Sequence, residues 1–130
     1  MNFDRKYLLF SLAYVALGMG LGVYMGASHE HGQLVTHAHI LLVGFVVSFI
    51  YSTIHRLWLQ QPSRGLANAQ FLCHQVGAAV MVVGLFLMFG GFVPEPTIGP
   101  VLGIASVIVL LGALLMIALV LKFPAPTKPA

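Results

Sequence analysis

The sequence predicts an all-α integral membrane protein, a bundle of four transmembrane helices. The chain has 130 residues, of which 59% are hydrophobic and only 7% are charged. Soluble domains carry about 25% charged residues, so this composition excludes that class. Four apolar segments are each long enough to cross a hydrocarbon core of about 30 Å. They cover approximately residues 7–27, 35–58, 67–92 and 98–122, and we expect them to form one domain over residues 1–130.

Three short breaks separate these segments. They read SHEHGQ, LQQPSRGLAN and VPEPTIGP, and the tail FPAPTKPA is also rich in proline. Because Pro and Gly interrupt helices, we predict loops at the breaks and a frayed tail. The basic residues stand before the first segment, around the second break and after the fourth segment: Arg5, Lys6, Arg56, Arg64, Lys122 and Lys128. The positive-inside rule then places both termini in the cytoplasm, and we expect the bilayer to be a bacterial inner membrane.

Glycines recur at helical spacing in the first and third segments. The first segment carries Gly18, Gly22 and Gly26, and one face of the third carries His74, Gly77, Met81, Gly84, Met88 and Gly91. Close helix packing explains both patterns, with methionines filling gaps. A groove for a flat cofactor explains them as well, with His74 as an axial ligand. The fourth segment has small residues but no histidine, so we expect a packing helix.

The second segment carries three histidines, His37, His39 and His55. Ionisable groups at membrane depth usually serve a function, and neutral imidazole is a common haem or metal ligand. At 100° per residue His37 and His55 share one face with Gly44, Ser48 and Ser52, which we expect to point inward. His39 projects away, with Val43, Val46 and Ile50, toward lipid, a second subunit or the outer interface. His37 and His55 lie about 27 Å apart along the helix, so they cannot ligate one haem.

His55 and His74 lie on consecutive helices joined by a short loop. Antiparallel neighbours bring them to depths that differ by about 5 Å, which allows a bis-histidine haem between them. The alternative is that His55 lies at the interface and bonds water or headgroups. We expect His74 to be a ligand.

The motifs HEH and HAH place four histidines close together in sequence. His29, His31, His37 and His39 offer imidazoles that could bind copper or zinc, although solvated loop histidines are ordinary. The single cysteine, Cys73, excludes an intrachain disulfide and a cysteine-rich metal site. The basic residues are scattered, so we expect no nucleic-acid partner.

A glycine-rich first segment followed by THAHILLVGFVVSFIY resembles the first two helices of the haem–copper oxidase and nitric oxide reductase catalytic subunit. The resemblance is closer to small four-helix proteins described as cytochrome c oxidase subunit I-like, with HAH opening helix 2 and a histidine–glycine pattern early in helix 3. The resemblance implies that His39 is the haem ligand, whereas the helical wheel favours His37. The later helices that supply the other metal ligands of the large oxidases have no counterpart, so oxygen reduction is not expected.

These observations together predict a b-type haem protein that transfers electrons. One or two haems per chain would use His39, His74, His37 and His55, and no CxxCH motif exists for covalent attachment. Quinol or a redox protein is the expected partner besides the lipid bilayer, and a homodimer could complete an outer haem site. An oxidoreductase activity stays open. The alternatives are a copper- or zinc-binding membrane protein that uses His29 and His31, and a cofactor-free subunit of a larger respiratory complex.

Overall fold

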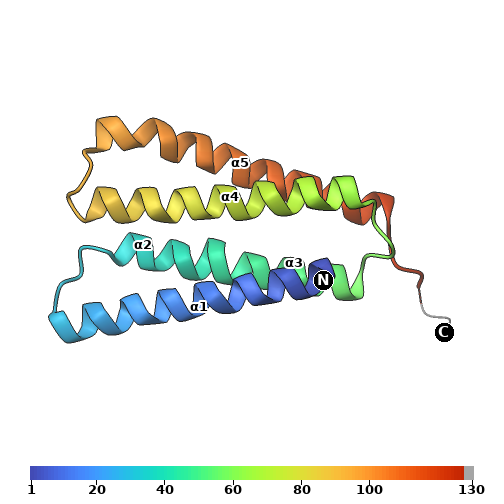
Figure 1. Ribbon diagram of the computed structural model, residues 1–130, viewed down its shortest axis with the longest axis horizontal. Helices are drawn as coiled ribbons and strands as arrows, with labels where there is room; N and C mark the ends of the chain where they lie inside the picture. The colour runs from blue at the N-terminus through green and yellow to red at the C-terminus, as the bar shows by residue number, and fades with distance from the viewer. Residues whose placement is uncertain (128–130) are drawn as a thin grey trace.

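The computed structural model describes residues 1–127, and its helices form four rods (Figure 1). The first rod is α1 (Phe3–Ser28), the third is α4 (Arg64–Phe89) and the fourth is α5 (Glu95–Lys122). The second rod is continuous but composite, with α2 (Leu34–His39), the π-helix η1 (Ile40–Val46) and α3 (Val47–Leu57) in sequence. All four rods are long and apolar enough to span a membrane. The expectation of an all-helical chain with four candidate spans is confirmed.

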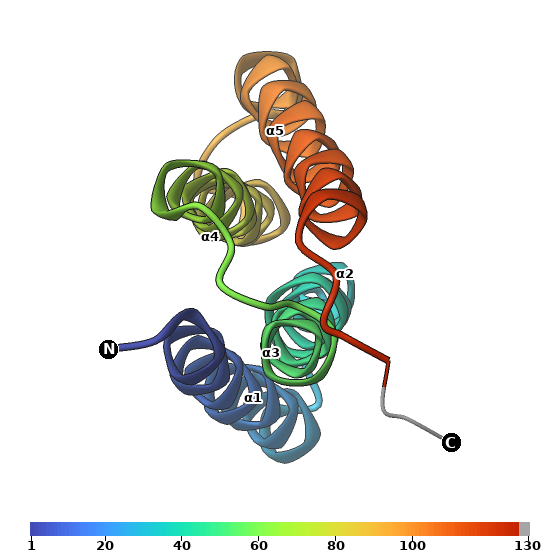
Figure 2. The ribbon, with the colours of Figure 1, turned by 90° about the vertical axis from the view of Figure 1, so that its right-hand side faces the viewer.

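The rods run up and down as two helical hairpins (Figures 1 and 2). In one hairpin α1 packs along the composite rod, and in the other α4 packs along α5. The hairpins meet chiefly where α4 lies against α2 and η1. Two groups of buried apolar residues fill the interior near this junction, and a third, around Tyr7, Tyr51 and Met116, joins α1, α3 and α5.

Large apolar side chains cover the outside of every rod. Each rod has at least one such side chain that is more than half exposed: Val23, Leu42, Val83 and Leu114, in chain order. In water so much contiguous apolar surface would drive aggregation, whereas acyl chains solvate it without cost. The exterior therefore matches a lipid environment.

Four of the eight helix ends differ from the predicted spans by three or four residues, and the other four agree within one residue. The first helix begins at Phe3 rather than near 7, because Asp4 stabilises its first turn. The last begins at Glu95 rather than near 98, with Pro96 in the first turn, where its missing N–H has no intrahelical acceptor anyway. The third helix ends at Phe89 rather than 92, and the chain turns at Gly91, whose φ of 74° suits glycine.

The tail is ordered further than predicted. The Gln60 amide donates to the Phe123 carbonyl at 3.0 Å, and the Ala125 amide donates to the Trp58 carbonyl at 2.9 Å. These bonds tie the tail to the loop after α3, so the expectation of fraying is wrong as far as Ala125. Lys128 lies outside the described residues.

The π-helix was not anticipated, and it changes which residues share a face. A π turn holds more residues than an α turn, so the 100° spacing fails beyond residue 40. Val43, predicted to project outward with His39, is instead partly buried against the interior. Gly44 lies within η1, and a Cβ there would overlap the Tyr14 ring of α1. Gly44, Ser48 and Ser52 are all buried, as the small and polar stripe predicted.

Candidate functional site

His74 lies at the centre of the bundle, in the third turn of α4, and is fully buried. Its Nε2 is 3.1 Å from the Ser48 hydroxyl of α3, which also accepts a hydrogen bond of 3.1 Å from the Gln75 amide. The Tyr51 ring stands edge-on to the imidazole, with 5.0 Å between centroids. On the other side, a Cβ at Gly112 of α5 would lie 3.2 Å from the His74 backbone nitrogen. The ring is thus enclosed by three helices.

A second polar chain runs beside this one. The Tyr7 hydroxyl of α1 donates to the Gln70 side-chain oxygen at 2.5 Å, and the Gln70 amide donates to the Gly112 carbonyl at 3.2 Å. Both side chains are fully buried. Polar groups without water must satisfy one another, so this chain fixes α1, α4 and α5 in register. Tyr7, Gln70 and Gln75 were not among the predicted site residues, although side-chain amides inside an apolar segment are a usable signal.

His55 lies near the end of α3, in an aromatic stack. Its ring is 5.4 Å from that of Phe3 and 5.7 Å from that of Tyr7, and its buried Nε2 has no hydrogen-bond partner among residues 1–127. Tyr7 also packs against His74, at 6.1 Å. A haem plane has no room between His55 and His74 unless the Tyr7 ring leaves. In this packing, His55 and His74 cannot bind one haem between them.

His37 and His39 lie at the opposite end of the composite rod, and backbone carbonyls orient both rings. His37 Nδ1 is 2.8 Å from the Gly18 oxygen of α1, and His39 Nδ1 is 2.9 Å from the Val35 oxygen of its own helix. A carbonyl oxygen can only accept, so each Nδ1 must carry the proton. The neutral ring then has its lone pair on Nε2, the form in which imidazole ligates iron.

The two rings differ in their surroundings. His37 packs against α1, where a Cβ at Gly22 would be 2.9 Å from its Cε1. Both residues are partly exposed, but the hydrogen bond of His39 is exposed whereas that of His37 is partly buried. The His39 ring is therefore the less enclosed of the two, and its donor chemistry fits an axial haem ligand.

The loop histidines do not gather with this pair. His29 and His31 are exposed, and His31 Nδ1 contacts the His29 carbonyl at 3.2 Å. Within residues 1–127, no three His, Cys, Asp or Glu side chains lie close enough to hold one metal ion. The outer copper or zinc cluster is therefore not assembled in this part of the chain.

The glycine patterns correspond to helix packing. Gly18 and Gly22 of α1 face Leu41 and His37 of the composite rod. On α4, Gly77 faces Val109 and Gly84 faces Leu102, both on α5. Side chains of neighbouring helices thus occupy the space that a flat cofactor would need along these two faces.

No protein-family model, curated protein or solved structure matches the chain. The case for a function therefore depends on the geometry of the histidines and on the motif residues themselves.

Proposed function

We propose that the protein binds b-type haem through His39 and transfers electrons within the membrane. The observation that carries the proposal is the hydrogen bond between His39 Nδ1 and the Val35 carbonyl, at 2.9 Å. This bond holds the ring in one orientation and leaves Nε2 free to donate its lone pair. Such a carbonyl contact on the second nitrogen is the usual support of a ligating imidazole, and it raises the ring's basicity.

The choice of His39 over His37 depends on enclosure. A haem is a rigid disc that needs open space in front of the ligating nitrogen. The His37 ring packs against Gly22 and its hydrogen bond is partly buried, whereas the hydrogen bond of His39 is exposed. His39 is also the member of HAH that matches the resembled family. His37 is the rival, and removing each ring in turn distinguishes them.

The second axial ligand would come from another copy of the chain. His74 cannot serve, because it bonds Ser48, nine residues beyond His39, at a depth about 13 Å away. A partly exposed histidine on the lipid-facing side is where a second copy can approach. We therefore propose a homodimer in which His39 of each copy faces the other.

A haem held there supplies one-electron redox chemistry, and the protein sets its potential through the ligands and the dry surroundings. Quinol, which is confined to the bilayer, is one proposed electron donor, and a redox protein is the other. His39 and Val35 orient the site, and the apolar exterior excludes water.

We also propose that the end bearing the Lys and Arg residues faces the cytoplasm of a bacterial inner membrane, so that His39 lies on the outer side. Arg5, Lys6, Arg56, Arg64 and Lys122 all lie at the end where α1 and α4 begin. Reporter fusions after Phe123 are expected to report a cytoplasmic location. An external reporter would reverse the proposed orientation.

The visible spectrum of the purified protein tests the proposed function. We expect a Soret band and sharp α and β bands on reduction with dithionite. A colourless protein, purified from cells supplied with a haem precursor, would contradict haem binding. Copper or zinc in that colourless protein would favour the metal-binding alternative, and a metal-free one would favour a structural subunit.

A further inference from the structure

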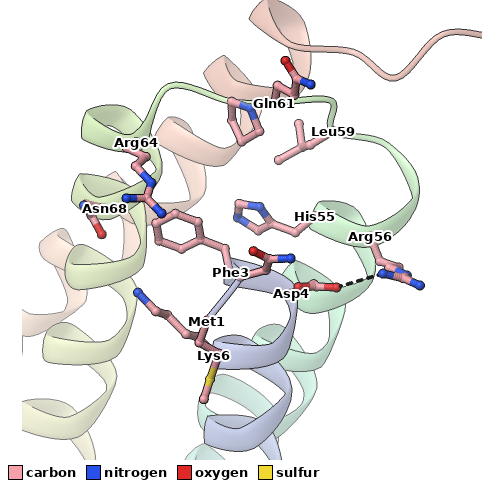
Figure 3. A pocket seen from close by; sticks show the side chains of 12 residues that line it. Met1, Phe3, Asp4, Lys6, His55, Arg56, Leu59, Gln61, Arg64 and Asn68 are labelled. Carbon is pink, nitrogen blue, oxygen red and sulfur yellow. Dashed lines mark ion pairs between the residues drawn. The ribbon is translucent and has the colours of Figure 1, made fainter.

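The basic end of the bundle, defined by Arg5, Lys6, Arg56, Arg64 and Lys122, holds a pocket that the haem proposal does not use. The pocket has a volume of about 490 Å³ and lies among the first turn of α1, the end of α3 and the start of α4 (Figure 3). Lys6, His55, Arg56 and Arg64 are among its lining residues. The pocket is therefore formed where three helices end and not along a single helix face.

Positive charge in this pocket is only partly compensated. Asp4 is the only Asp or Glu side chain at this end among residues 1–127, and its ion pair, at 3.5 Å, is with Arg56. Lys6 and Arg64 make no ion pair within that range, and Lys6 Nζ lies 4.8 Å from the centre of the Phe3 ring. Figure 3 shows Lys6 and Arg64 on the side of the pocket opposite Arg56. The C-terminus of α3 partly offsets the N-termini of α1 and α4, so the positive potential that favours an anion comes chiefly from the two uncompensated cations.

His55 adds a polar contact within the same pocket. Its Nε2 is buried and has no hydrogen-bond partner among the described residues. A buried polar atom without a partner is costly, so a ligand oxygen at this position would stabilise the pocket. The stack against Phe3 fixes the ring's orientation.

A second hollow adjoins this pocket and is apolar. It also measures about 490 Å³, and it shares Asp4 and Arg56 with the first. Leu8, Phe49 and Leu57 line it, between α1 and α3. Because Leu8 and Phe49 lie about one to two turns inward from the basic end, the groove extends from the charged pocket toward the apolar length of the bundle. A charged hollow followed by an apolar groove suits an amphiphile with an anionic head.

We infer that the basic end binds one anionic phospholipid. Its phosphate would lie in the first hollow, beside Lys6 and Arg64. One acyl chain would pass Asp4 and Arg56, which the two hollows share, and follow the groove past Leu8 and Phe49. Basic pockets beside membrane-spanning helices are suited to such headgroups. The exposed Trp58 at this end lies where aromatic residues meet the lipid headgroups.

Lipid retention measured by native mass spectrometry of the full chain tests this inference. The protein is mixed in detergent with phosphatidylglycerol or phosphatidylcholine, and the fraction carrying one lipid is compared. Each basic contact contributes about a fivefold change in affinity. We expect wild type to prefer phosphatidylglycerol, and Arg64→Gln or Lys6→Gln to weaken its binding about fivefold.

Lys122→Gln is the matched control, because it removes one positive charge from the same end outside both hollows. Equal losses of phosphatidylglycerol binding in Arg64→Gln and Lys122→Gln would show general attraction to the basic surface and would contradict binding in the pocket. Equal retention of both lipids would overturn the preference for an anion. Displacement of phosphatidylglycerol by millimolar glycerol phosphate or inorganic phosphate would identify a soluble phosphate as the ligand and contradict the inference of a lipid ligand. His39→Ala protein is expected to retain the lipid, which separates this site from the haem proposal.

Discussion

The histidine in the middle of the bundle and the two at the end opposite the basic residues are held by different kinds of partner. His74 is bonded by a serine hydroxyl and enclosed by Tyr51 and Gly112. His37 and His39 are held at Nδ1 by backbone carbonyls, which cannot donate in return. The hydroxyl can donate or accept, so it fixes no tautomer, whereas the carbonyl fixes the proton on Nδ1. Burial alone therefore does not identify a ligand.

The buried histidine has a clear structural task. Ser48, Gln75 and His74 link the composite rod to α4, and Tyr7 and Gln70 link α1 to α4 and α5. In a membrane, apolar surfaces gain little by meeting one another, because lipid is equally apolar. Polar bonds between helices thus carry much of the specificity of the arrangement. We expect this region to determine stability, and the end that holds His37 and His39 to determine the proposed cofactor binding.

The largest expected effect is that of His74→Ala on stability. Removing the ring leaves a cavity and takes a partner from Ser48, which should cost roughly 2–5 kcal/mol of unfolding free energy. Thermal unfolding in detergent measures it, and His31→Ala, in the exposed loop, is the control, with a change within about 0.5 kcal/mol. Equal midpoints for the two variants would show that the buried network does not stabilise the bundle.

Gly22→Ala is expected to have a smaller effect on stability, at the end that holds His37. The new Cβ would lie 2.9 Å from His37 Cε1, so the ring or α1 must shift, at a cost of about 1–3 kcal/mol. Gly26→Ala on the same helix is the matched control, because nothing lies within 4 Å of its Cβ position. Alanine's helix propensity should leave that variant unchanged or up to about 1 kcal/mol more stable. If both substitutions stabilise the protein equally, His37 does not pack against α1 as described.

Tyr7→Phe should have the smallest effect of the three. It removes the hydroxyl that donates to Gln70 and keeps the ring that packs against His55 and His74. The expected loss is about 0.5–1.5 kcal/mol, with Tyr24→Phe, more than half exposed, as the control. If the unfolding midpoint of Tyr7→Phe is no lower than that of Tyr24→Phe, the Tyr7–Gln70 hydrogen bond does not stabilise the protein.

Sequence reasoning recovered the four rods because length and hydrophobicity define a span locally. It also recovered the buried stripe of Gly44, Ser48 and Ser52, since small and polar residues in a span point inward. The partners of His74 and Tyr7 were not recoverable, because they lie 26 and 63 residues away along the chain. Their pairing depends on how the helices pack.

The π-helix also could not be predicted from the hydrophobic pattern of the sequence. The segment Ile40–Val46 is uniformly apolar apart from Gly44, so no period in it signals an extra residue per turn. The wheel therefore misplaced Val43. The orienting carbonyls of His37 and His39 belong to Gly18 and Val35, and sequence identity says nothing about a backbone oxygen. The sequence identifies the histidines as candidate ligands, and only the structure shows which groups bond each of them.

The ratio of haem to folded chain in wild type, His39→Ala, His37→Ala and His74→Ala tests the central claim most directly. Each variant is purified by size exclusion in detergent, and haem is quantified as the pyridine haemochrome. The account predicts haem in wild type, loss in His39→Ala with recovery on adding imidazole, and an unchanged ratio in the fraction of His74→Ala that remains folded. Retention of haem in His39→Ala together with its loss from folded His74→Ala would contradict the account and make the buried histidine the ligand.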